Sequence, residues 1–200
     1  MKTHGFFFDE LVSFIPYGTP WVERAIQNMK YGGMFGIATV LASELARRLA
    51  ASHSDASAVV TWIPLHGRRL RERGFNQAER IGRAVAQQLG LEAIPLIAKT
   101  HQPAAQAGLG VQERATNLRG VFRHNVPRRT GLTAIFRHRG LDERQDFVIT
   151  GKTVILVDDV VTTGATLSEA ARVLRSLGCA KVIAVTIAYS PLRNTRQAKT

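Results

Sequence analysis

Two adjacent aspartates followed by a short segment of threonines and a glycine form the strongest chemical signal in the sequence. Asp158 and Asp159 come directly after the apolar run 153–157, and Gly164 lies just before an amphipathic segment. The first N–H groups of a helix have no partners within the helix and lie at the positive end of its dipole, so such a turn can bind a phosphate. Carboxylates beside a phosphate need hydroxyl groups or a cation to bind. The segment therefore favours a sugar phosphate, with its hydroxyls on the aspartates and Mg²⁺ nearby.

A second candidate for phosphate chemistry is the basic segment that follows the β-branched run 58–63. Four arginines lie between residues 68 and 73, and His66 precedes them. Guanidinium groups pair well with phosphate oxygens. The alternative is a solvated basic loop in which His66 is an ordinary exposed histidine.

The elements that must position these residues are predicted from periodicity. A strand over 153–157, a helix over 166–177 and a strand over 181–187 make a β-α-β unit, so the sheet is parallel there. Thr166 with Glu169 predicts a capping box at the start of that helix. Further strands are predicted over 58–63 and 94–98, and further helices over 21–29, 34–51 and from Asn76 to Gly90. We therefore expect one domain over 1–200, made of a helical part (1–57), a core (58–190) and a flexible tail (191–200).

The composition indicates a polyanionic partner. The chain has 27 Lys and Arg against 15 Asp and Glu, a formal net charge of +12. Such a charge favours nucleic acid, a phosphorylated ligand or an anionic membrane surface. From residue 99 to 139, Lys99 and seven arginines stand against Glu113 alone. Phe75, Phe122 and Phe136 are candidates for stacking with bases.

A single cysteine, Cys179, excludes an internal disulfide and a cysteine-based zinc site. We find no apolar run of membrane-spanning length, and the apolar residues 6–8 are too few for a signal peptide. We therefore expect a cytoplasmic protein without zinc and without a membrane span.

The segment 154–166 resembles the phosphoribosyl pyrophosphate (PRPP) motif of type I phosphoribosyltransferases. The resemblance implies that Asp158 and Asp159 are catalytic and hold the ribose 2- and 3-hydroxyls. They are also the only protein residues that it implies as contacts of Mg²⁺. Thr162 stands where many purine-salvage members carry an acidic residue, which argues against 6-oxopurine salvage. The 5-phosphate would be bound by Val160, Val161, Thr162, Thr163, Gly164, Ala165 and Thr166.

The basic segment resembles one family within the type I phosphoribosyltransferases. Pro64-Leu65-His66 followed by Arg-Glu-Arg-Gly-Phe-Asn-Gln (71–77) resembles the ComF family, of the ComFC/GntX type. Residues 29–32 (Met-Lys-Tyr-Gly) agree with it, as does the pattern Gln106, Leu109, Glu113, Arg114, Asn117, Gly120, Val121 and Phe122. Together these segments cover roughly residues 20–190. This chain departs from the family in lacking the four-cysteine zinc module with which many members begin.

The resemblance implies a type I phosphoribosyltransferase-like (Rossmann-like) fold, a mostly parallel sheet flanked by helices with a basic loop or hairpin insertion at about 128–146. His66, Arg68 and Arg69 would face the pyrophosphate, and residues 99–120 would correspond to a mobile loop that closes over PRPP.

Three functions remain open on the sequence alone. The resemblance implies a role in natural competence, the uptake of single-stranded DNA together with a helicase or other competence proteins. The residues expected to contact DNA are Arg71, Arg73, Arg114, Arg119, Arg128, Arg129, Arg137 and Arg139. The alternatives are an active Mg²⁺-dependent phosphoribosyltransferase of nucleotide metabolism, with an acceptor that the sequence does not identify, and a basic α/β domain with a relict site.

Overall fold

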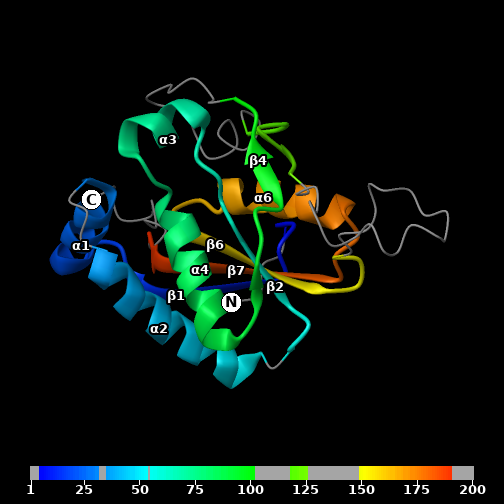
Figure 1. The fold of residues 1–200 in the computed structure, drawn as a ribbon, viewed down its shortest axis with the longest axis horizontal. Helices are drawn as coiled ribbons and strands as arrows, with labels where there is room; N and C mark the ends of the chain where they lie inside the picture. Colours follow the sequence, from blue (N-terminus) through cyan, green and yellow to red (C-terminus); the bar gives the residue numbers. More distant parts are fainter. Residues whose placement is uncertain (1–4, 32–34, 54, 102–117, 126–148, 191–200) are drawn as a thin grey trace, which may run out of the picture.

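The chain folds into a parallel β-sheet with helices on both faces (Figure 1). This computed structural model describes residues 5–31, 35–53, 55–101, 118–125 and 149–190. The main sheet contains β1 (Glu10–Pro16), β2 (Val59–Trp62), β3 (Glu92–Ala93), β6 (Thr153–Val161) and β7 (Lys181–Tyr189). The described helices are α1 (Pro20–Tyr31), α2 (Phe35–Ser52), α3 (Gly67–Arg73), α4 (Gln77–Leu89) and α6 (Ala165–Ser176). The strand order is β1-β7-β6-β2-β3, and each neighbouring pair is parallel. The expected α/β fold class is confirmed.

The two longest strands, β6 and β7, form the centre of the sheet. Residues 154–157 of β6 and 182–188 of β7 are buried without interruption. Strands of a parallel sheet are covered on both faces, so they read as continuous apolar runs rather than as alternating ones. That composition explains why these two strands could be predicted from the sequence.

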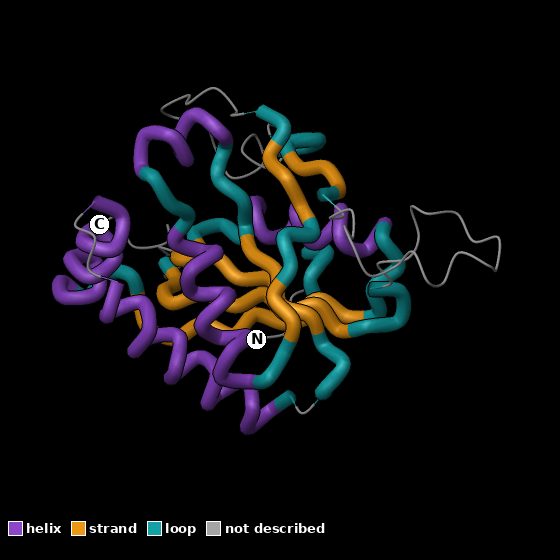
Figure 2. Tube along the Cα trace, in the orientation of Figure 1, coloured by secondary structure: helices purple, strands orange, loops and turns teal. Residues whose placement is uncertain are grey.

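Side chains of β6 alternate between two apolar cores. Ile155 and Val157 pack in the core beneath α1, α2 and α4. Val154 and Leu156 pack in the core on the other face, beneath α6. A two-stranded antiparallel ribbon, β4 (Ile97–Lys99) with β5 (Phe122–His124), packs beside α6 in the same core (Figures 1 and 2).

The strands all end at one edge of the sheet. Because β1, β2, β6 and β7 are parallel, the segments that follow them lie at this carboxyl edge. Backbone hydrogen bonds join neighbouring segments there: Ser190 N–H donates to the Val161 carbonyl (2.8 Å), and Tyr17 N–H donates to the Tyr189 carbonyl (2.7 Å). Open α/β sheets bind their ligands at this edge.

Three elements differ from the sequence prediction. The part expected to be helical, 1–57, contains the edge strand β1, which pairs with β7 more than 170 residues away. The segment 67–73, expected as a loop, forms α3, a helix without buried residues and therefore without apolar periodicity. The single strand expected over 94–98 is two strands, and Pro95 lies between them. The basic insertion expected at about 128–146 lies outside the described residues.

None of the five described helices, over the ranges given above, combines the length and the apolar character of a membrane span.

Candidate functional site

The turn between β6 and α6 has the geometry of an anion-binding loop. Gly164 is the N-cap of α6 with φ of +78°, and it supplies no side-chain hydrogen bond to the first turn. The Thr163 hydroxyl accepts a long hydrogen bond from Ala165 N–H (3.4 Å). The first turn therefore keeps donor capacity for an anion at the positive end of the helix dipole. Glycine adopts this left-handed conformation without the steric cost that a Cβ brings.

The capping box expected from Thr166 and Glu169 is wrong. Glu169 is buried (7% exposed) and accepts a hydrogen bond from Gly120 N–H at 2.8 Å. The Arg172 guanidinium donates two more, at 2.7 and 2.8 Å. The Arg172 bond lowers the pKa of Glu169 despite its burial, and the Gly120 N–H lowers it further. Glu169 thus ties α6 to the segment leading into β5 instead of capping its own helix.

The acid pair lies near the carboxyl end of strand β6, and both aspartates are half-buried. The Asp158 carboxylate accepts a hydrogen bond from Asp159 N–H at 2.9 Å. Asp158 continues the alternation of Val154 and Leu156, so we place it on the face covered by α6 and the β4–β5 ribbon. The structure therefore brings the acid pair and the glycine turn together within seven residues of chain at the carboxyl edge.

The basic segment after β2 is anchored at the same edge by Asn76. This buried side chain donates from Nδ2 to the Ile63 carbonyl (2.9 Å) and accepts from Ala78 N–H (3.1 Å). It therefore holds the end of β2 against the start of α4, with α3 projecting between them in Figure 1. The helix start predicted at Asn76 is confirmed, and Asn76 is the N-cap of α4.

The predicted phosphate-binding residues of this segment lie at the start of α3. His66 is the N-cap, and its Nδ1 accepts from Arg68 N–H at 3.3 Å. The Arg68 guanidinium pairs with Glu72 at 2.9 Å on the surface. Arg69 and Arg71 are exposed, and Arg73 is half-buried. The segment thus presents a cationic surface beside the site, with Arg68 held by its own helix.

Lys99 is a site residue that no sequence pattern identified. It is half-buried at the end of β4, with Nζ 5.8 Å from the centre of the Phe122 ring. Burial lowers the pKa of Lys99, the charge of Arg69 lowers it further, and the carboxylate of Asp158 raises it. These three charges therefore interact, and they join the ribbon, α3 and β6 into one site. A lysine that ends an apolar strand was the only signal available in the sequence.

An aromatic segment near the N-terminus lies beside the glycine turn. A Cβ built on Gly164 would lie 3.1 Å from Cε1 of Phe6. The Phe6 ring stacks on Phe8 with centroids 4.9 Å apart, and Phe7 N–H donates to the Ser168 hydroxyl at 3.1 Å. Phe6 is still 41% exposed, so it borders the turn without sealing it.

The residues expected to contact DNA are only partly described. Arg119 is exposed, and its charge contributes to the lowered pKa of Glu169. Arg114, Arg128, Arg129, Arg137 and Arg139 lie outside the described residues. Phe122 is 4% exposed, so its expected stacking role is wrong. Phe75 is half-buried beneath the Arg80 guanidinium (4.6 Å to the ring centre), and Phe136 lies outside the described residues.

Comparison with known proteins agrees with this geometry. The profile of the phosphoribosyl transferase domain matches residues 77–199. The chain is 29% identical over 180 residues to "DNA utilization protein YhgH" of Salmonella typhi, covering 88% of this chain and 70% of that protein. The chain is also 29% identical over 180 residues to "Competence protein F" of Haemophilus influenzae, covering 88% of this chain and 70% of that protein. The resemblance to ComF-type proteins is therefore confirmed.

Phosphoribosylpyrophosphate synthetase from Mycobacterium smegmatis superposes with a TM-score of 0.44 and 19% identity, over 74% of this chain and 33% of that chain. The present chain thus spans about a third of that protein. A hypoxanthine phosphoribosyltransferase from Staphylococcus aureus superposes with a TM-score of 0.43 and 15% identity, over 82% of this chain and 67% of that chain.

Proposed function

This chain belongs to the phosphoribosyl transferase domain family, and we propose that its carboxyl-edge site binds PRPP or ribose 5-phosphate. The observation that carries the proposal is the acid pair of β6 joined to the glycine-capped start of α6. The segment 160–166, from the end of β6 to the first turn of α6, supplies backbone donors to the 5-phosphate. Asp158 and Asp159 accept hydrogen bonds from the ribose hydroxyls, a charge-assisted contact that a phosphate alone could not offer them.

The pyrophosphate arm of PRPP extends toward the cationic surface of α3. His66, Arg68 and Arg69 lie there, and Lys99 reaches the same region from the ribbon. To bind a phosphate oxygen, Arg68 must break its exposed ion pair with Glu72. The cost is small because exposed ion pairs contribute about 0–1 kcal/mol to stability. The ammonium of Lys99, disfavoured by burial, gains a compensating anion when pyrophosphate arrives.

The donor set fits Mg²⁺. In the described ranges no group of three or more His, Cys, Asp or Glu could hold a metal. Mg²⁺ is bound by one or two carboxylates together with substrate phosphates, so Asp158 and Asp159 are the residues that would hold it. When bound, it neutralises charge on the pyrophosphate as that group leaves.

The names of the relatives support a role in DNA uptake. Proteins named "Competence protein F" and "DNA utilization protein YhgH" match 88% of this chain. We propose that this chain handles single-stranded DNA inside the cell, with a helicase or other competence protein as partner. The charge of +12 suits a polyanion. The second candidate is turnover as a phosphoribosyltransferase, favoured by the family match itself.

Calorimetry on the purified full chain tests the proposal. PRPP should bind one molecule per chain in Mg²⁺ and more weakly in chelator, and ribose 5-phosphate should bind without needing Mg²⁺. Absence of heat with both ligands contradicts the proposed site. Pyrophosphate release from PRPP, measured with and without nucleobases, distinguishes a binding protein from an active transferase.

A further inference from the structure

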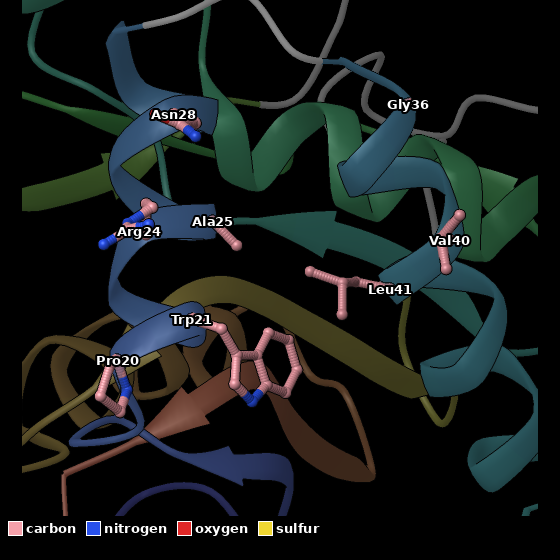
Figure 3. Close-up of a pocket in the computed structure, with 8 residues that line it drawn as sticks. All are labelled: Pro20, Trp21, Arg24, Ala25, Asn28, Gly36, Val40 and Leu41. Carbon is pink, nitrogen blue, oxygen red and sulfur yellow. The ribbon is translucent and has the colours of Figure 1, made fainter.

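An apolar groove between α1 and α2 is left open on the surface. Its volume is about 890 Å³, and among the residues that line it only Arg24 is charged (Figure 3). Trp21 projects into the space from α1, and Leu41 faces it from α2. Val40 lies on the same wall and is 70% exposed. The described part of the chain thus leaves an exposed apolar surface next to a cation.

The groove-facing side of α1 has no role in the core. Val22, Ile26 and Met29 carry the packing of this helix and are buried. Trp21 is 57% exposed, although tryptophan is costly to leave in water. Trp21, Arg24 and Asn28 have spacings of three and four residues, which place them in one row along the helix. The row combines an aromatic face, a guanidinium and an amide.

The groove lies toward the same edge of the molecule as the proposed PRPP site. Strand β1 is parallel to β7 and β6, and α1 begins four residues after its end. Tyr17 N–H, in the connection to α1, donates to the Tyr189 carbonyl at the end of β7 (2.7 Å). Figure 1 shows α1 beyond the carboxyl ends of the strands, on the side from which α3 also projects.

We propose that this groove binds a base of single-stranded DNA, with the indole of Trp21 as its stacking surface. The inference rests on the proposed DNA-handling role and names the contact that serves it. Stacking of a base on an aromatic ring beside a cation is the general mode of sequence-tolerant binding to single strands. Arg24 pairs with the phosphate of the stacked nucleotide, and the Asn28 amide bonds a base edge. The net charge of +12 favours this polyanion over an apolar peptide as occupant.

The experiment compares Trp21→Phe with Trp21→Leu in the full chain. Both keep the groove apolar, but only phenylalanine keeps a flat ring. Anisotropy with a labelled thymidine oligonucleotide of about ten residues should show Trp21→Leu binding about 5- to 150-fold more weakly, the range of one lost stacking contact, and Trp21→Phe much closer to wild type. Because Trp21 is exposed, melting curves of both variants should match wild type.

Tryptophan fluorescence gives an independent readout. The other tryptophan, Trp62, is 4% exposed, so quenching by the oligonucleotide should come from Trp21 and vanish in Trp21→Phe. Arg24→Gln should flatten the dependence of log affinity on log salt by about 0.7. Its control, Arg47→Gln, removes an equal charge from an exposed pair with Glu44 on α2 and should leave the slope nearly unchanged.

Equal affinities of Trp21→Leu and Trp21→Phe, without quenching, overturn the proposal. If wild type still binds the oligonucleotide in that case, the DNA-handling role stands and the groove is a surface for an apolar protein partner. Absence of any binding at low salt overturns both the groove and the DNA role. PRPP calorimetry on the same samples then shows independently whether the nucleotide site survives.

Discussion

Replacing Gly164 with alanine separates the two tasks of this residue, forming the turn and admitting a phosphate. At φ of +78° a Cβ approaches the following carbonyl oxygen, which costs about 1–2 kcal/mol. The added atom would also lie 3.1 Å from the Phe6 ring. That ring is exposed and can move, so the contact should add little. We therefore expect Gly164→Ala to lower the free energy of unfolding by about 1–2 kcal/mol.

Gly90 offers a matched control. It follows α4 with φ of +67°, and a Cβ there meets nothing within 4 Å. Gly90→Ala should lose the same stability in urea titrations. Only Gly164→Ala should weaken PRPP binding, by about 10-fold or more, because the methyl group displaces phosphate oxygens from charge-assisted bonds of about 1.5–3 kcal/mol.

Results for PRPP affinity and for the free energy of unfolding could each refute this reasoning. Equal PRPP affinity of the two variants would show that the turn does not hold the phosphate. A much larger loss of stability in Gly164→Ala that Phe6→Ala relieves would show that the aromatic contact, not the backbone conformation, dominates the cost.

Three further predictions concern charges and burial. Glu169→Gln should cost about 1–3 kcal/mol of unfolding free energy at neutral pH. Folding lowers the pKa of Glu169 below 4.5, so the stability that its carboxylate adds to wild type is lost as the pH falls through the folded pKa. The urea midpoints of wild type and Glu169→Gln should therefore converge in acid. The control is Glu79→Gln, which removes a carboxylate from an exposed ion pair. A gap that persists in acid contradicts the role of the carboxylate. Lys99→Met should weaken PRPP binding in calorimetry by about 10-fold without lowering Tm, since burial already disfavours the ammonium, and unchanged affinity counts against its place in the site. Burial raises the pKa of the Cys179 thiol, so maleimide labelling followed by mass spectrometry should be slow in the native protein and fast in urea; rapid native labelling would contradict the burial.

The core of the site could be predicted from the sequence because its signals are local. The acid pair, the glycine turn and the first turn of α6 occupy 158–166, and the apolar run of β6 fixes where they lie. Parallel pairing of β6 and β7 then follows from the short helical connection between them. The start of α4 at Asn76 was likewise predicted from neighbouring residues alone.

Other parts depend on contacts that a local pattern does not contain. Glu169 has the spacing of a capping box, but Gly120, 49 residues away, and Arg172 bind it instead. Strand β1 is recognisable only through its partner β7. Lys99 joins the site through tertiary structure, since Asp158, whose charge acts on its pKa, is 59 residues further along the chain.

The most direct test of the account is a PRPP titration of three proteins in Mg²⁺. Wild type should bind, and Asp159→Asn should bind about 10- to 150-fold more weakly, the loss of one charge-assisted hydrogen bond of about 1.5–3 kcal/mol. Asp55→Asn makes the same chemical change in an exposed turn before β2, at the opposite edge of the sheet, and should bind like wild type. Equal affinity of all three proteins would contradict the assignment of the acid pair to the ribose.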